Sequence, residues 1–192
     1  MEKDFDGMVE RLLDSPCWVI DMLPMRVPQE GAGQFFAVER YYLQEPQRDG
    51  LCRRFADVLL KLNCYHDLHV SQGDGWVKNP EPATLVAWLA EVLQHGHLCA
   101  LIDGGDALIT ASSGDTHLTL YNPSPELLEL ARQLANASGL FLWQPKEKQS
   151  SRCCEEFRCE NFRNEGYLMN KEGGRTISVL PPCVIDGGSR PC

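Results

Sequence analysis

Apolar side chains recur at helical spacing along several stretches of the chain. The clearest stretch is residues 47–63, and residues 80–94 and 125–137 repeat the pattern, with charged side chains elsewhere around each turn. Such a stripe is typical of a helix that packs one face on a core. We therefore predict a helix in each stretch and a shorter one at residues 4–14. The stripe of the first stretch consists of Leu51, Phe55, Leu59 and Leu62.

Short apolar runs separated by glycine and aspartate predict strands joined by tight hairpins, because these residues adopt the positive φ angles of such turns. Residues 17–23 and 140–143 add two more extended runs. Residues 34–43 also look extended, although their aromatic side chains fit a helical period as well. Most strand pairing should then be antiparallel. The runs that flank the hairpin turns are residues 66–71, 76–78, 98–102, 107–111 and 116–121.

The order of helices and hairpins predicts an α+β fold with a mostly antiparallel sheet and helices packed on one face, a two-layer sandwich. Residues 1–145 are long enough for one globular domain with a single core. From residue 146 the apolar pattern is lost, and residues 146–192 hold five cysteines and one short apolar run. We expect a linker followed by a cysteine-rich, poorly ordered tail.

Two segments with a common Asn-Pro-x-Pro pattern lead from a strand into a helix, at Asn79 and Asn122. Asn79 is expected to cap the helix that follows it. Ser124 is expected to cap the helix at residues 125–137, which ends at Gly139 in a left-handed conformation. Independent use of good cap chemistry explains the likeness more simply than duplication of a hairpin-helix unit.

Charge is uneven along the chain. Residues 1–145 hold 10 Lys and Arg against 20 Asp and Glu, whereas residues 146–192 hold 8 against 7. An acidic body repels phosphate groups, so binding to nucleic acid or to anionic membranes is not expected. A basic protein partner suits this charge better.

The sequence lacks the features of export and of membrane insertion. Its first residues, MEKDFDGMVERLL, are acidic and interrupted by charge, and its apolar runs are far shorter than the roughly 20 residues that span a bilayer. The nine cysteines are then best explained as reduced thiols of a cytoplasmic protein. Four of them lie in apolar stretches and are predicted to be core residues, namely Cys17, Cys52, Cys64 and Cys99.

Histidine and aspartate gather near predicted strand ends in the middle of the chain. This mixture of imidazole and carboxylate suits a hard or borderline cation. Turn chemistry explains the same residues, because Asp is frequent in hairpin turns and polar residues end helices. A metal-dependent hydrolase built on them is therefore kept as an alternative, and no cofactor is expected. The candidate metal ligands are His95, His97, Asp103, Asp115 and His117.

The thiols of the tail raise a second metal hypothesis. Cys154, Cys159, Cys183 and Cys192 are separated by four, twenty-three and eight residues. Structural zinc sites usually pair their ligands about two to four residues apart at both ends. Only the first pair comes close to this spacing, so incidental cysteines in a tail are the simpler explanation.

No motif in the sequence assigns a catalytic residue. The chain contains neither a G-x-S-x-G elbow nor a glycine-rich phosphate loop. Asp21, the one charged residue inside an apolar strand, is expected to face water or to pair with Arg40. The sequence therefore favours a protein without catalytic activity.

Four aromatic residues lie close together in the chain, at Phe35, Phe36, Tyr41 and Tyr42. In an extended strand half of these rings face away from the core, where they provide a contact surface for a partner. The candidate partner-binding residues are Phe36, Tyr41 and Tyr42. The leading hypothesis is a small acidic protein that acts by protein-protein binding, as an adaptor, a regulator or an immunity-type protein. A domain with a purely structural role is a further alternative.

Overall fold

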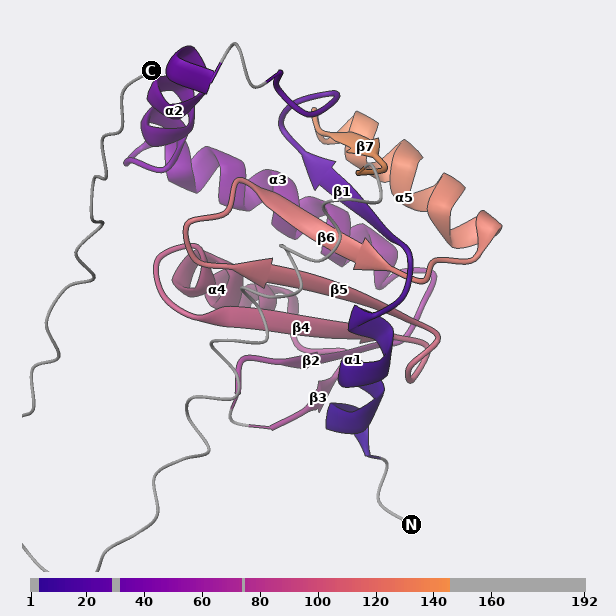
Figure 1. Ribbon diagram of the computed structural model, residues 1–192. Coiled ribbons are helices and arrows are strands. Elements are labelled where there is room, and N and C mark those ends of the chain that lie inside the picture. The colour runs from indigo at the N-terminus through magenta and orange to yellow at the C-terminus, as the bar shows by residue number, and fades with distance from the viewer. Residues whose placement is uncertain (1–3, 29–31, 74, 146–192) are drawn as a thin grey trace, which may run out of the picture.

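The computed structural model describes residues 4–28, 32–73 and 75–145, and the predicted tail lies outside them. This part of the chain forms one seven-stranded sheet with five helices (Figure 1). The helices are α1 (Phe5–Leu13), α2 (Ala32–Tyr42), α3 (Gln47–Leu62), α4 (Pro82–Val92) and α5 (Pro125–Ala137). The strands are β1 (Cys17–Asp21), β2 (Leu68–Ser71), β3 (Val77–Lys78), β4 (His97–Ile102), β5 (Ala107–Ser112), β6 (His117–Tyr121) and β7 (Phe141–Trp143).

All strand pairs of the described sheet are antiparallel, in the order β3-β2-β4-β5-β6-β1-β7. Hairpins join β2 to β3, β4 to β5 and β5 to β6. The turns use the positive φ angles that the sequence indicated, with 50° at Asp103, 123° at Gly105 and 80° at Gly114. The predicted α+β class with its mostly antiparallel sheet is therefore confirmed.

Helices α3, α4 and α5 cover one face of the sheet, and α3 packs against the other two (Figure 1). The apolar stripe of α3 is completely buried, with Phe55, Leu59 and Leu62 each 0% exposed. Alternate residues of the strands meet this stripe, such as Leu118 and Leu120 of β6. Full burial of one such side chain contributes about 1.5–3 kcal/mol. Helix α3 is therefore the centre of the main core.

Helix α1 lies on the opposite face of the sheet and covers part of it (Figure 1). Val9, Leu12 and Leu13 form a second buried cluster with strand residues, among them Leu101 and Tyr121. The prediction that helices share one face holds for the three helices of the main core. Because the strands carry apolar residues on both faces at this end, α1 adds a smaller core on the other side.

Residues 34–43 are helical and not extended, since α2 spans Ala32–Tyr42. The aromatic spacing of this segment fits both periods, so the pattern alone did not decide between them. The described sheet ends at β3 and β7, and neither of these strands pairs with this segment. With no partner strand among the described residues, the backbone satisfies its own hydrogen bonds as a helix.

The two Asn-Pro-x-Pro segments share a backbone feature but not a role. Asn79 and Asn122 both adopt a positive φ, 46° and 52°, yet Asn79 does not cap α4, which begins at Pro82 without a side-chain cap. The cap predicted at Ser124 is confirmed, because its Oγ accepts the backbone N–H of Leu127 at 3.2 Å. The strand after α4 pairs with β2, whereas the strand after α5 pairs with β1. The two units therefore differ in topology.

Among residues 4–28, 32–73 and 75–145, no helix is long and apolar enough to cross a membrane. The longest, α3, has 16 residues and carries charged side chains among its apolar ones.

Candidate functional site

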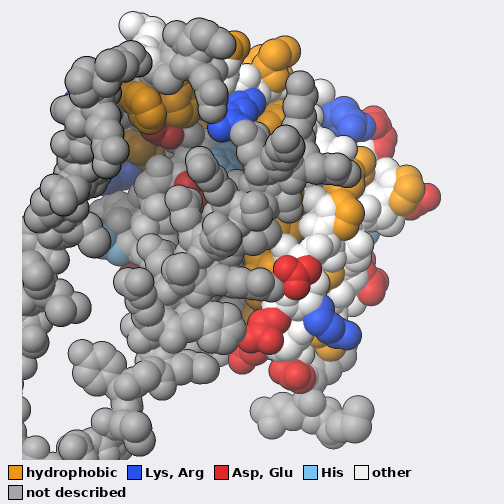
Figure 2. Space-filling view, in the orientation of Figure 1, with side chains coloured by type: hydrophobic (Ala, Val, Ile, Leu, Met, Phe, Trp, Pro, Cys, Tyr) orange, Lys and Arg blue, Asp and Glu red, His pale blue; other side chains and the backbone are white. Residues whose placement is uncertain are grey.

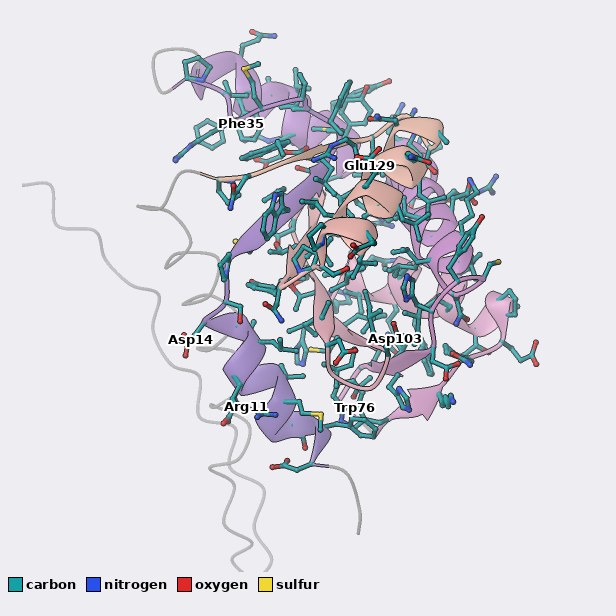
Figure 3. The ribbon with its side chains drawn as sticks, turned by 90° about the vertical axis from the view of Figure 1, so that its right-hand side faces the viewer. Arg11, Asp14, Phe35, Trp76, Asp103 and Glu129 are labelled. Atoms are coloured by element: carbon teal, nitrogen blue, oxygen red, sulfur yellow. The ribbon has the colours of Figure 1, made fainter. Side chains whose placement is uncertain are left out.

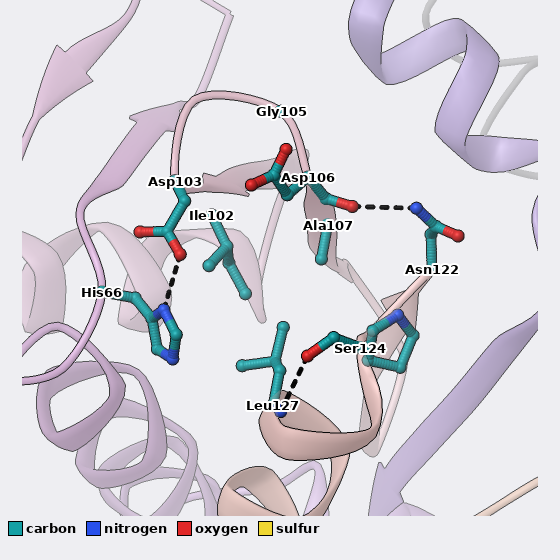
Figure 4. A pocket seen from close by; sticks show the side chains of 10 residues that line it. His66, Ile102, Asp103, Gly105, Asp106, Ala107, Asn122, Ser124 and Leu127 are labelled. Carbon is teal, nitrogen blue, oxygen red and sulfur yellow. Dashed lines mark hydrogen bonds and ion pairs between the residues drawn. The ribbon is translucent and has the colours of Figure 1, made fainter.

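The described residues form a pocket of about 480 Å³ at one end of the sheet (Figure 4). It lies where β4 turns into β5, beside the segment that leads from β6 into α5. Ile102, Ala107 and Leu127 form its apolar floor, and polar side chains surround them. The polar side chains are those of His66, Asp103, Asp106, Asn122 and Ser124.

His66 and Asp103 form a hydrogen-bonded pair on one side of the pocket. Nδ1 of His66 lies 2.6 Å from Oδ2 of Asp103, and Oδ1 of the same carboxylate accepts the backbone N–H of Asp67 at 3.1 Å. Asp103 also donates its backbone N–H to the carbonyl oxygen of Asp67 at 2.8 Å. In the tautomer that carries the ring proton on Nδ1, His66 donates to this carboxylate and its Nε2 is an acceptor.

The loop before β2 is held beside the pocket by the side chain of Asn79. Its Oδ1 accepts the backbone N–H of Leu68 and a side-chain N–H of Asn63, both at 2.8 Å. Its Nδ2 donates to Asp67 at 2.7 Å, and Nζ of Lys78 lies 2.6 Å from Oδ2 of Asp67. The hydrogen bond from Asn79, followed by that from Lys78, holds the pKa of Asp67 below its ordinary value. Several contacts therefore fix this loop.

The turn into α5 forms the opposite side of the pocket. Asn122 donates its side-chain N–H to the backbone carbonyl of Asp106 at 2.9 Å, which leaves its Oδ1 as an acceptor. Glu126 lies in the first turn of α5. Hydrogen bonds from the backbone N–H of Glu126 itself and from the side chain of Ser124 lower the pKa of its carboxyl group. One of the helix's own carboxylates therefore already lies at the positive end of α5.

The second candidate surface is the aromatic face of α2. None of the side chains described in this helix, residues 33–42, is buried. Phe36 is 59% exposed and Tyr41 53% exposed. The rings lie in pairs, with centroids 5.7 Å apart for Phe35 and Phe36 and 5.4 Å apart for Tyr41 and Tyr42. Figure 2 shows apolar side chains at this end of the molecule, and Figure 3 shows Phe35 there from the side. We call these four residues the α2 aromatic surface.

Carboxylates from three segments lie near one another beside α2. The register of β1 and β6 places Asp21 opposite His117. Burial raises the pKa of Asp21, although the backbone N–H of Leu23, at 3.0 Å, and the charge of His117 oppose this effect. Burial, and then the negative charge of Asp115, raise the pKa of Glu39 on α2, and Asp21 adds to this effect. Negative charge is therefore concentrated at this end of the sheet.

The structure does not bring the five candidate metal ligands together. His95 lies exposed before β4 and His97 begins this strand, whereas Asp103 follows its other end. Asp115 lies in the turn before β6, which begins at His117. Within residues 4–28, 32–73 and 75–145, no three His, Cys, Asp or Glu side chains are grouped so that they hold a metal ion. The tail cysteines lie outside these ranges.

Three of the four predicted core cysteines are buried, and the prediction was wrong for the fourth. Cys17, Cys52 and Cys99 are buried, whereas Cys64 is exposed. Cys64 follows the last residue of α3, Leu62, so it no longer shares the direction of the apolar stripe. Its thiol donates to the carbonyl oxygen of Leu60 at 3.5 Å.

The predicted pair of Asp21 and Arg40 is absent from the ion pairs formed between described residues. The carboxylate of Asp21 accepts the backbone N–H of Leu23 instead. Arg40 is exposed on α2.

Sequence reasoning missed the role of His66. The residue was assigned to the start of a strand, but it precedes β2, and its partner Asp103 is 37 positions away. Only the pairing of β2 with β4, which sets Leu68 opposite Ile102, brings the two side chains together. No local pattern carries that information. The one available signal was the repeated Asn-Pro, because Asn122 lines the same pocket.

Comparisons of the chain with protein-family models, with curated proteins and with solved structures gave no match. The described residues define an α+β protein with a seven-stranded antiparallel sheet. Two features of this fold present side chains that another molecule could contact. They are the pocket at one end of the sheet and the α2 aromatic surface. Function is therefore inferred from these two features.

Proposed function

We propose that this protein acts by binding another protein through the α2 aromatic surface. The observation that carries this proposal is the lack of any buried side chain among residues 33–42 of α2, a helix with four aromatic residues. Helices of this length are marginal in water and owe most of their stability to a buried apolar face. A partner that covers the exposed rings supplies such a face, and exposed aromatic residues are frequent at interface centres.

The partner proposed here is a protein with Lys and Arg on its contact surface. Glu39 lies on α2 itself, and Asp21 and Asp115 lie close enough to raise its pKa. A cationic side chain placed there relieves the repulsion between these carboxylates. Cations also bind over Tyr and Phe rings, which contributes about 0.5–1 kcal/mol at exposed sites. The balance of 10 basic against 20 acidic residues in residues 1–145 favours such a partner further.

An adaptor, a regulator or an immunity-type protein acts by binding another protein in this way, and none of the three requires catalysis.

A cytoplasmic location accords with the four free cysteines in the described residues. Nucleic acid and anionic membranes remain poor partners for a surface of this charge. The metal-dependent hydrolase receives no support from the described residues, which hold no group of three metal ligands.

Site-specific photo-crosslinking identifies such a partner directly. In the native cell, Phe36→p-benzoylphenylalanine is expected to yield one dominant crosslinked protein, identified by mass spectrometry. Tyr65, which is 68% exposed but lies beyond α3, provides the matched control position. The identified protein is then purified, and its affinity is measured by titration calorimetry.

For the purified pair, Phe36→Ala and Tyr41→Ala are each expected to weaken binding at least about tenfold, the effect of losing about 1.4 kcal/mol at an interface centre. Tyr65→Ala should leave the affinity unchanged, and added salt should reduce it. Equal affinity of all three variants would refute the role of α2. Self-association through α2, detected by sedimentation and lost in Phe36→Ala, would identify a second copy as occupant and would also refute the proposed partner.

A further inference from the structure

We propose that the pocket beside His66 and Asp103 is a binding site for a guanidinium group carried on an aliphatic stem. This site is separate from the protein-binding surface proposed above. Asp103 follows the end of β4, whereas the carboxylates beside α2 lie around His117 at the start of β6, at the other end of the sheet. A ligand of the pocket therefore leaves the α2 aromatic surface free.

The polar groups that surround the pocket are hydrogen-bond acceptors. Oδ1 of Asn122 is left as an acceptor because Nδ2 bonds to the carbonyl of Asp106, and Nε2 of His66 is an acceptor in the tautomer that donates from Nδ1 to Asp103. The carboxylate of Asp106 takes no hydrogen bond from the described residues and is exposed at the rim. The lining contains no Lys or Arg. Such a set of groups is complementary to a ligand that is rich in donors.

The charge of the pocket selects a cation over an anion. Asp103 and Asp106 bring two carboxylates to the lining. The start of α5 would otherwise attract an anion, but Ser124 caps one of its N–H groups and Glu126 lies in its first turn. An anionic ligand would therefore meet two carboxylates in the lining and a helix end that Ser124 already caps.

The shape of the pocket suits a flat head group with an apolar stem. Figure 4 shows acceptors on both sides, with Asp103 and His66 facing Asn122 and Ser124 across the floor. A guanidinium presents five N–H donors in one plane and can bond to both sides, whereas an ammonium is a compact point charge. The methylene groups of the stem can lie against the apolar floor residues, and a volume of about 480 Å³ admits one side chain of this size.

Two sources can supply this group, an arginine side chain of a peptide or a free small guanidine. Titrations followed by ¹H–¹⁵N NMR separate them, with N-acetyl-arginine amide as the first probe and agmatine as the second. Either probe is expected to shift the backbone signals of Asp67 and Gly105 and the side-chain signal of Asn122 in a saturable way. N-acetyl-citrulline amide, which has the same shape without the charge, should leave these signals unchanged. Saturable shifts with one probe alone assign the source and support the site.

Asp106→Asn is the decisive variant, because this carboxylate has no partner among the described residues and its loss removes no structural contact. We expect it to weaken binding of the arginine probe about tenfold or more, as for loss of one charge-assisted hydrogen bond. Asp49→Asn removes an equal charge from an exposed position in the first turn of α3 and should change the affinity less than twofold. Equal effects of both variants, equal binding of the citrulline probe, or no saturable shift with either guanidine would overturn the site. None of these results bears on α2, which the crosslinking experiment tests separately.

Discussion

Oδ1 of Asn79 lies 2.8 Å from the backbone nitrogen of Leu68, so the residue after β3 satisfies the backbone donor at the start of β2. The same oxygen accepts from Asn63, and the Nδ2 of Asn79 donates to Asp67. One side chain therefore joins the end of α3, the start of β2 and the entry to α4. The positive φ of Asn79, 46°, is what turns this amide toward the three segments.

Asn79→Ala should reduce the free energy of unfolding by about 2–3 kcal/mol, because it leaves the N–H of Leu68 without its acceptor and removes the side-chain hydrogen bonds that let Asn tolerate a positive φ. Urea denaturation measures this change. Asn79→Gly relieves the backbone strain but not the lost acceptor, so it should recover about 1 kcal/mol. Equal loss in the Ala and Gly variants would show that φ strain plays no part.

Phe55→Ala should cost about 3–5 kcal/mol, because the ring is 0% exposed at the centre of the main core and its removal leaves a cavity. Leu130→Ala on α5 is the matched control, since Leu130 is only partly buried against the same core. Its cost should be clearly smaller, and the slope of the urea transition should stay the same for both. If the two variants lose equal stability, α3 is not the centre of the core.

Among the described cysteines, Cys64 should react first with iodoacetamide. Cys64 is exposed, whereas burial, with a smaller effect from Asp6, raises the pKa of the Cys99 thiol to about 12. The thiolate is the reactive form, so Cys99 should stay unmodified at pH values near 8, as should buried Cys17 and Cys52. Brief alkylation followed by peptide mass spectrometry reads each site separately. Early labelling of Cys99 would contradict its position under α1.

Asp21 should make the native protein lose stability as the pH rises. Burial raises its pKa above the ordinary 3.8, so the folded state binds the proton more tightly than the unfolded state does. This contribution to the free energy of unfolding is fully present below pH 3.8 and is lost as the pH rises through the folded-state pKa. Asp21→Asn does not titrate and keeps an acceptor for Leu23. Its stability relative to the native chain should therefore increase across that window, as measured by urea denaturation at successive pH values.

Asp67 provides a control of opposite sign. Hydrogen bonds from Asn79 and Lys78 lower its pKa below 3.8, so its contribution is present above pH 3.8 and is lost as the pH falls through the folded-state pKa. Asp67→Asn should thus lose stability relative to the native chain at higher pH. Parallel curves for the native chain and Asp21→Asn would mean that Asp21 is not desolvated in the folded protein.

Local pattern was sufficient for most elements of the fold. The stripe that includes Phe55 and Leu59 predicted α3, and the Gly-Asp turns predicted the hairpins, because both signals arise within a few residues of the chain. The segment at 34–43 was different, since its rings fit two periods and the described strands include none that pairs with α2. Its exposed rings were expected for a strand and are found on a helix instead.

Local sequence patterns could not predict the pocket, because its sides come from segments that are distant in the sequence. Asp103 was recognised as a turn residue, which its φ of 50° confirms. The contact of this carboxylate with His66 follows from the pairing of β2 with β4, and its position opposite Asn122 follows from the β5–β6 hairpin. Turn chemistry and ligand chemistry use the same residue types, so the sequence marked Asp103 as a turn residue and a candidate metal ligand but gave no sign of its contact with His66.

The two outermost strands of the sheet, β3 with two residues and β7 with three, are the shortest in the described fold. So little free backbone gives a foreign chain almost no ladder to extend, and Pro80 just after β3 lacks the amide hydrogen that further pairing would need. Fibril growth by edge-to-edge stacking is disfavoured for the same reason. This protein must then recognise other molecules through its side chains and not by adding a strand to its sheet. Side-chain substitutions that leave every strand intact can therefore change which molecule the protein binds.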